Sequence, residues 1–245
     1  MKNLTQYGGL AAALVVAWQI LHWMVGGGSL ASPWETVLAL AEMLQTTEFW
    51  LHVAETGRAL AYALLIGLAG GLVLGLILGV NRLARDVTEP ILLNLYAVPK
   101  VTLYPLVLLA FGLGLSAKVA FGVMHGIIPI MVFTMSAIRQ MRPVLLRASQ
   151  SMRLTTRQSI LHVVLPAILP DVVSGLRLAF SLTLLGVLIG EMFASQRGLG
   201  YVLTNAMNLG DIRTIMAVAL FLTVFALTCN LSLIHISEPT RRRGI

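Results

Sequence analysis

The stretch from Ala59 to Asn81 contains no charged residue and is rich in leucine, isoleucine and glycine. An α-helix rises about 1.5 Å per residue, so a run of this length crosses the roughly 30 Å hydrocarbon core of a bilayer. Five further stretches have a similar length and apolar character: Gly9 to Val25, Ile91 to Ala117, Val119 to Ile138, Leu178 to Gln196 and Thr214 to Ser237. The sequence therefore predicts an all-α membrane protein, a bundle of six transmembrane helices.

The composition agrees with this prediction. Hydrophobic residues make up 58% of the 245 residues and charged residues only 11%, whereas soluble domains have about 45–50% and roughly 25%, respectively. This excludes a soluble enzyme and an ordinary nucleic-acid-binding domain, although the formal net charge is +7. Cys229 is the only cysteine, so neither an intrachain disulfide nor a cysteine-based zinc site is expected.

Charged residues are distributed unevenly between the loops. The connection between the fourth and fifth apolar stretches contains Arg139, Arg142, Arg147, Arg153 and Arg157. The first long loop instead contains Glu35, Glu42, Glu48 and Glu55. Because arginine-rich loops stay on the cytoplasmic side, we expect a multi-pass protein of the bacterial inner membrane with both termini in the cytoplasm. The basic charge is then explained by topology, with anionic lipid headgroups as its partner and no nucleic acid.

One cytoplasmic loop, about residues 139–170, is longer than most helix connections in a compact bundle. Pro143 suits the first turn of a helix, and Thr155 with Gln158 fits a capping box that starts a second short helix. We expect Pro166 to end that second helix. The loop therefore predicts two short helices, which either lie on the lipid surface or bind a soluble partner.

The residues of this loop have the spacing of the EAA loop of ABC-transporter permeases. The corresponding positions are Arg147, Ala148, Ser149, Arg153, Val163, Leu165 and Pro166. With Glu191 and the Gly198-Leu199-Gly200 turn, the chain resembles the nitrate/sulfonate/taurine branch of binding-protein-dependent importers over roughly Arg58 to Asn230. Arginine replaces the family's glutamate at Arg147 and its glycine at Arg153. Glycine tolerates positive φ in a tight turn, so we expect strain or a different turn at Arg153.

The resemblance implies the fold of a type I ABC importer permease and the function of its transmembrane subunit. It also implies a translocation path for a small anionic solute such as a sulfonate or nitrate. The implied partners are a second permease copy, ABC ATPase subunits bound to the loop, and an extracytoplasmic substrate-binding protein. No phosphate-binding Gly-x-x-x-x-Gly-Lys-Ser/Thr loop occurs, and the histidines lack metal-ligand spacing. We therefore expect a transport subunit without cofactor or metal, and not an enzyme.

Two charged residues lie in apolar stretches, where a charge is costly and commonly functional. Lys100 follows Pro99 and either faces the translocation path or extends toward the headgroups. Glu191 either forms a hydrogen bond at the glycine-rich turn or acts in the path or its gate. The alternative class is a secondary transporter or channel without an ATPase, which favours charged coupling residues at the midplane and inverted repeats.

Small residues recur at four-residue spacing in the second stretch, where they allow close approach of helices. They are Gly67, Gly71, Gly75 and Gly79. This pattern indicates either packing within one chain or a seam between two copies.

The chain divides into three expected parts. Residues 1–57 contain the first transmembrane helix and an extracytoplasmic loop, and residues 58–230 form the core permease domain. Residues 231–245 form a tail, in which Leu231 to Arg241 resembles translated sequencing-adapter read-through. We expect this tail to be non-native. The alternative is an ordinary basic cytoplasmic tail, because Arg241, Arg242 and Arg243 agree with the charge rule.

Overall fold

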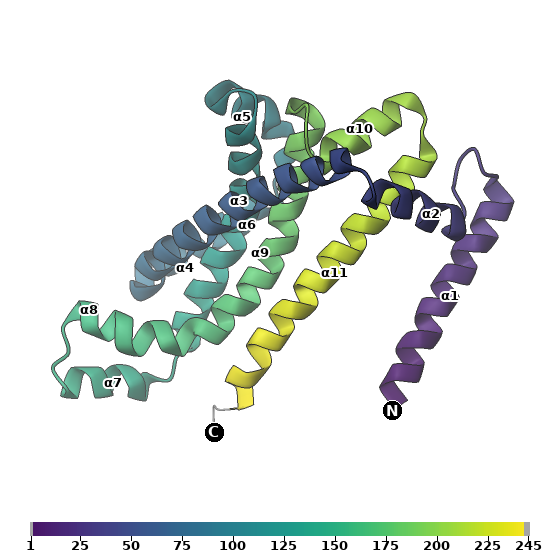
Figure 1. Cartoon of the computed structure of the whole chain (residues 1–245). Coiled ribbons are helices and arrows are strands. Elements are labelled where there is room, and N and C mark those ends of the chain that lie inside the picture. The colour runs from purple at the N-terminus through teal and green to yellow at the C-terminus, as the bar shows by residue number, and fades with distance from the viewer. Residues whose placement is uncertain (1, 243–245) are drawn as a thin grey trace.

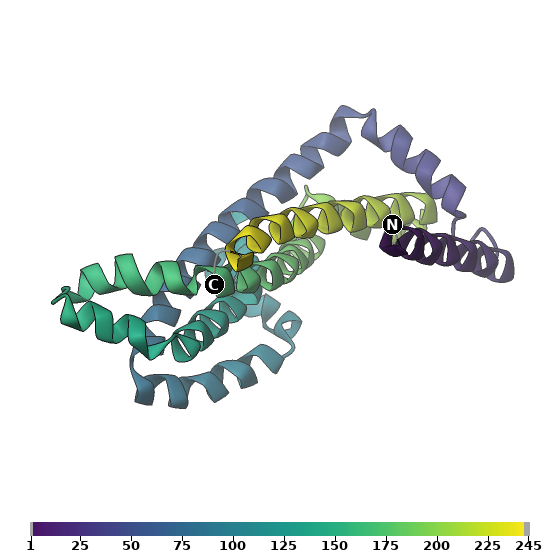
Figure 2. The same ribbon diagram turned by 90° about the horizontal axis from the view of Figure 1, so that it is seen from below.

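The computed structural model describes residues 2–242, except for the side chains of residues 2–5, 7, 194 and 234–242. All of its regular structure within this range is helical, as Figures 1 and 2 show. In chain order the elements are α1 (Lys2–Val25), α2 (Pro33–Leu44), α3 (Thr47–Val80), α4 (Arg82–Ala97), η1 (Lys100–Leu103), α5 (Tyr104–Phe111), α6 (Leu115–Gln140), α7 (Pro143–Ser151), α8 (Thr156–Ser159), η2 (Ile160–Val164), α9 (Leu165–Ala194), α10 (Leu199–Leu209) and α11 (Ile212–Arg242).

Five of the described helices are long and apolar enough to cross a bilayer: α1, α3, α6, the continuous α8–η2–α9 helix, and α11. They correspond to five of the six predicted apolar stretches, although Asn81, Ser195 and Gln196 lie just beyond the helix ends, so the prediction of an all-α membrane bundle is confirmed. Helix α6 makes the most extensive contacts, with α9 on one side and α3 on the other, and these three helices form the central group. Figure 1 shows α11 beside this group, whereas α1 stands apart and is joined to it through α2.

The third predicted stretch is not one straight helix. The axes of α4 and of η1–α5 differ by 86°. Pro99 has no N–H and disfavours helical geometry at the residue before it, and Val98 is extended with φ −63° and ψ 133°. After α5, Gly112 and Gly114 have φ values of +73° and +118° and turn the chain into α6, which already contains Ala117. Together the bent pair is the sixth candidate span.

Helices α3 and α6 approach each other closely. The glycines of the four-residue pattern lie buried on α3: Gly67, Gly71, Gly75 and Gly79. A Cβ atom at Gly71 would lie 2.8 Å from Ile130, and one at Gly75 would lie 2.7 Å from Thr134. The Thr134 hydroxyl donates to the Ile130 carbonyl at 2.7 Å, so this buried polar group is paired. Of the two interpretations of the glycine pattern, packing within one chain is confirmed.

The helix that begins with α8 does not end at Pro166, so that prediction was wrong. It continues through η2, a π-helical turn, into α9. The Leu165 N–H donates to the Ile160 carbonyl, five residues earlier. This wider turn stands directly before Pro166, which cannot donate a backbone hydrogen bond and whose ring would clash in a regular α-helix. The change of hydrogen-bonding pattern allows the proline inside a continuous helix.

Two of the expected domain boundaries fall inside helices. The boundary after residue 57 lies in α3, and the boundary before residue 231 lies in α11. Residues 231–242 continue the backbone of α11, whereas residues 243–245 of the expected tail lie outside the described part of the chain. The division into three parts and the non-native origin of the tail stay predictions.

Candidate functional site

Helices α7 and α8 form a hairpin, here called the α7–α8 hairpin (Pro143–Ser159). Pro143 lies in the first turn of α7, as predicted. The predicted capping box is also present, because Thr155 Oγ1 accepts the Gln158 N–H at 3.3 Å and Gln158 Oε1 accepts the Thr155 N–H at 2.9 Å. Figure 1 shows the hairpin at the same end of the molecule as the start of α1. The long loop that the sequence predicts therefore contains two short helices, as expected.

The turn of the hairpin uses the left-handed conformation that the family's glycine would favour. Arg153 has a φ of +50°, the only positive φ at a non-glycine residue in the described chain. Its N–H donates to the Gln150 carbonyl at 2.9 Å, and the Leu154 N–H donates to the Ser149 carbonyl at 3.1 Å. These bonds close the end of α7, where glycine commonly occupies the left-handed position. An L side chain costs about 1–2 kcal/mol there.

A pair of hydroxyl groups connects the two helices of the hairpin. Ser149 is buried, and its hydroxyl donates to the Leu146 carbonyl at 2.8 Å. The Ser159 hydroxyl donates to Ser149 Oγ at 3.2 Å. A cavity of about 310 Å³ lies between the hairpin and the ends of α3 and α6. A hydrogen bond thus holds the two helices of the hairpin together next to a small cavity.

The other predicted loop residues differ in exposure. Arg147, Ala148, Arg153 and Pro166 are exposed, whereas Val163 and Leu165 are half-buried. Val164, between Val163 and Leu165, is buried and packs with Ala137 and Ile168. The loop therefore presents its arginines outward and anchors the start of α9 in the core.

At the opposite end, Glu191 is the centre of a buried hydrogen-bond network. Its side chain is fully buried. The Thr56 hydroxyl donates to the carboxylate at 2.9 Å, and the Gly200 N–H donates to Oε2 at 3.0 Å. Lys118 Nζ lies 4.0 Å from Oε1. A buried carboxylate is tolerated when it is paired and hydrogen-bonded in this way. The arrangement matches the expected hydrogen bond at the glycine-rich turn.

Lys118 is a member of this network that the sequence analysis missed. Its side chain is 2% exposed. Its ammonium group donates to Glu55 Oε1 at 3.1 Å and to the Arg197 carbonyl at 3.0 Å. The available signal was a single charge at the edge of the fourth apolar stretch, but nothing in the sequence says that this charge faces inward.

Three successive N–H groups at the start of α10 each have a side-chain acceptor. The Gly198 N–H donates to His52 Nδ1 at 3.0 Å, and the Leu199 N–H donates to Thr56 Oγ1 at 2.8 Å. The Gly200 N–H donates to Glu191, as described above. Gly198 has φ +116°, and a Cβ atom there would lie 2.2 Å from the Glu191 carboxyl carbon. The Gly-Leu-Gly turn and the glutamate before it are therefore parts of one structure that fixes α10 on α3 and α9.

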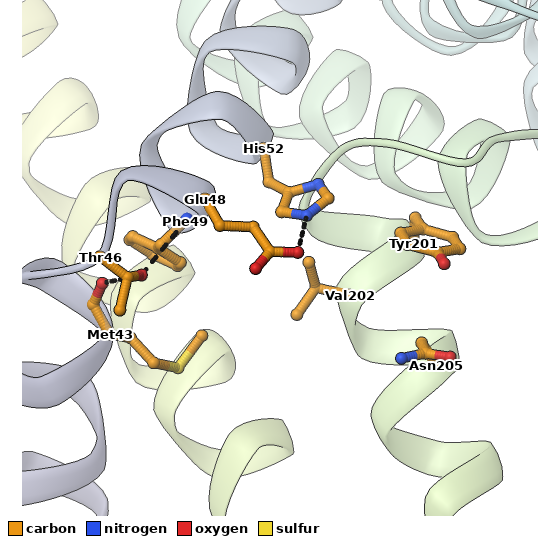
Figure 3. A pocket seen from close by; sticks show the side chains of 8 residues that line it. All are labelled: Met43, Thr46, Glu48, Phe49, His52, Tyr201, Val202 and Asn205. Carbon is orange, nitrogen blue, oxygen red and sulfur yellow. Dashed lines mark hydrogen bonds and ion pairs between the residues drawn. The ribbon is translucent and has the colours of Figure 1, made fainter.

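Two cavities flank this network. Figure 3 shows the smaller, of about 220 Å³, where Glu48 and His52 of α3 face Tyr201, Val202 and Asn205 of α10. Its Glu48 carboxylate lies 4.0 Å from His52 Nε2. The larger, of about 570 Å³, is lined by Glu55, Leu113, Gly114, Lys118, Phe193, Ser195, Gln196 and Arg197. No group of three residues suited to hold a metal ion is found among the described residues.

Lys100 lies at the bend between α4 and η1, away from the Glu191 network. Its ammonium group donates to the Tyr96 carbonyl at 3.1 Å and lies 4.9 Å from the centre of the Tyr96 ring. Within the described residues it forms no ion pair with a carboxylate. The structure therefore does not bring together the two residues predicted for the translocation path.

These features define the class. A bundle of apolar helices with a bent span and an ordered arginine-bearing hairpin is the architecture of a multi-pass membrane protein. Residues 71–238 match the family described as "Binding-protein-dependent transport system inner membrane component", and the chain belongs to this family. It is therefore an inner-membrane permease component of an ABC importer. The predicted family, fold class and non-enzymatic function are confirmed.

Relatives and solved structures agree with this assignment. The chain is 27% identical to the putative aliphatic sulfonates transport permease protein SsuC of Bacillus subtilis, over 89% of this chain and 80% of that protein. It is 25% identical to the taurine transport system permease protein TauC of Escherichia coli, over 84% and 77%. In fold it is similar to a chain of the inward-facing MetNI methionine ABC transporter, with a TM-score of 0.66, 21% identity, and coverage of 78% of this chain and 96% of that chain.

Proposed function

We propose that this chain forms half of the translocation path of an ATP-driven importer for a small anionic solute. A second copy of the chain supplies the other half, two ATPase subunits bind the α7–α8 hairpin, and an extracytoplasmic binding protein delivers the solute. The observation that carries the proposal is the hairpin itself. It has the EAA-like spacing, its arginines are exposed, and its second helix is continuous with a membrane-spanning helix.

This continuity gives the hairpin a mechanical function. Because α8, η2 and α9 form one helix, movement of the hairpin is transmitted directly to α9 and to the Glu191 network at the other end of that helix. An importer needs such an element to have two arrangements, whose balance depends on both the ATPases and the solute. In this proposal Glu191 positions the outer turn, which acts as the gate.

Charge and distance support a cytoplasmic hairpin. Arg139 lies at one end of α6 and Lys118 near the other, about 31 Å apart along the helix axis, which is the thickness of a hydrocarbon core. The hairpin arginines are at the Arg139 end, and Glu55 is at the Lys118 end. The charge rule then places the hairpin and both termini in the cytoplasm.

Accessibility labelling tests this orientation. Single cysteines replace Glu42 in α2 and Gln150 in α7, both exposed, in a Cys229→Ala background. A membrane-impermeant maleimide should modify position 42 in intact cells, and position 150 only after permeabilisation. Labelling of position 150 from outside would overturn the orientation.

The proposed anionic solute rests on the relatives and on Lys100. SsuC and TauC are named for aliphatic sulfonates and taurine, which carry a sulfonate group. Lys100 lies at the bend of the sixth candidate span, between α4 and α5, and hence at membrane depth in this proposal. A cation at this depth without a carboxylate partner commonly faces a cavity or an ion pathway. We therefore assign Lys100 to the wall of the translocation path.

Uptake measurements in proteoliposomes containing the permease, its ATPase and its binding protein test this role, with taurine and nitrate as probes. Lys100→Cys in the Cys229→Ala background should reduce uptake about tenfold, the factor for loss of one charge-assisted hydrogen bond. Aminoethyl methanethiosulfonate rebuilds a cationic side chain and should restore uptake, whereas a neutral methyl reagent should not. Thr102→Cys, exposed in the same turn, is the matched control. Equal uptake by the two cysteine variants would contradict the assignment.

A further inference from the structure

All the charged residues of the α7–α8 hairpin are cations. The chain has no acidic residue between Glu89 and Asp171. Three exposed arginines lie in the hairpin, Arg147, Arg153 and Arg157, and a fourth, Arg142, lies directly before it. None of the four is in an ion pair within the described residues, whereas Arg139, outside the hairpin, pairs with Glu89 at 3.0 Å. The hairpin thus presents unpaired guanidinium groups.

Apolar side chains lie among these arginines. Met152, at the tip of the hairpin, is 71% exposed, and Val144 is 62% exposed. Methionine and arginine are both enriched in protein interfaces. A guanidinium group forms planar, two-pronged pairs with carboxylates and phosphates, so the hairpin suits a partner with anionic groups at defined positions.

The rigidity of the hairpin favours a protein partner over a lipid surface. The Ser159–Ser149 hydrogen bond holds the two helices together. The positive φ of Arg153 holds the tip in a strained turn. Such strain persists where fixed positions are required, and a fluid layer of headgroups requires none.

Building on the proposed function, we infer that the ATPase subunit receives this hairpin in an acidic socket. The socket has an apolar floor that contacts Met152 and a rim of aspartate or glutamate side chains that pair with the arginines. The EAA-like pattern has glutamate where this chain has Arg147, so a partner with a basic site for that glutamate would repel this hairpin. The ATPase that binds this hairpin therefore has acidic groups, and not basic ones, where it meets Arg147.

Binding of the purified ATPase to the full-length permease tests the inference. The permease is placed in nanodiscs of phosphatidylcholine, and its affinity for the ATPase from the neighbouring gene is measured at low and high salt. Charge pairing predicts an affinity that falls about tenfold or more as salt increases. Arg147→Glu should weaken binding by a similar factor at low salt, and Arg147→Lys should weaken it less.

The control is Arg82→Glu, which makes the same charge change at an exposed position outside the hairpin. Rescue of Arg147→Glu by an acidic-to-arginine substitution in the ATPase socket would support the inference directly. Equal effects of Arg147→Glu and Arg82→Glu, or salt-independent binding, would overturn it. Effects of Arg147→Glu that occur only in nanodiscs with phosphatidylglycerol would overturn it in favour of a lipid contact. Absence of wild-type binding at every salt concentration would instead refute the proposed function, on which the inference rests.

Discussion

Substitution of Gly198 by alanine tests the buried network around Glu191. Alanine would have to adopt φ +116° and ψ 166°, a region occupied almost only by glycine. Its Cβ atom would lie 2.2 Å from the Glu191 carboxyl carbon. That carboxylate cannot move away freely, because Thr56 and Gly200 donate hydrogen bonds to it and Lys118 lies beside it. We therefore expect a large loss of stability.

The magnitude follows from two separate costs. The backbone conformation costs about 1–3 kcal/mol. Overpacking of a buried site costs about 1–3 kcal/mol more. Gly210→Ala is the matched control, because Gly210 also has positive φ (+68°) but has no atom within 4 Å of its Cβ position. Gly210→Ala should lower the free energy of unfolding only by the cost of placing an L side chain in the left-handed conformation, about 1–2 kcal/mol.

The assay is thermal unfolding of the purified protein in detergent micelles, followed by circular dichroism. For a chain of this size, 1 kcal/mol shifts the midpoint by about 2–4 °C. A difference of about 2 kcal/mol between the variants then corresponds to about 4–8 °C. Gly198→Ala should also cost less in a Glu191→Ala background, where the carboxylate is absent. Equal shifts for the two glycine variants, or no coupling to position 191, would refute the argument.

Three further predictions concern the hairpin turn, the start of α11 and the tail. Arg153→Gly should raise the free energy of unfolding by about 1 kcal/mol, because it removes the positive-φ strain; an unchanged or lower midpoint in the same assay would contradict this. Asp211 caps α11, and the Thr214 hydroxyl and N–H that donate to its carboxylate lower its pKa. Its stabilising effect is present above its unfolded pKa and is lost as pH falls through the lower folded pKa. Asp211→Ala should therefore lower stability by about 1 kcal/mol at neutral pH, and have little effect once the pH is below that folded pKa. Resequencing the locus should show that the codons for residues 231–245 are absent from the genome; an uninterrupted genomic reading frame through them would refute the adapter origin.

The sequence by itself determined the features that depend on neighbouring residues. Hydrophobic length identified the spans, because the bilayer requires a fixed number of apolar residues whatever lies around them. The capping box at Thr155 was also predictable, since it follows from hydrogen bonds within a few residues. The strained turn at Arg153 was expected from the resemblance, because the family has glycine at that position. The helix end expected at Pro166 was wrong because a π turn, a wider local geometry, compensates for the proline.

Only the tertiary structure decided which distant residues meet. Thr56 and Glu191 are separated by 135 positions, and their hydrogen bond depends on the rotation of α3 and α9 about their axes. The inward direction of the Lys118 side chain is likewise set by tertiary packing, that of α6 between those two helices. Tertiary structure also produces the 86° bend that separates Lys100 from the Glu191 network. Hydrophobicity places a helix in the membrane, but an apolar environment on all sides leaves its rotation undetermined. Close packing at glycines and buried polar pairs then select one rotation.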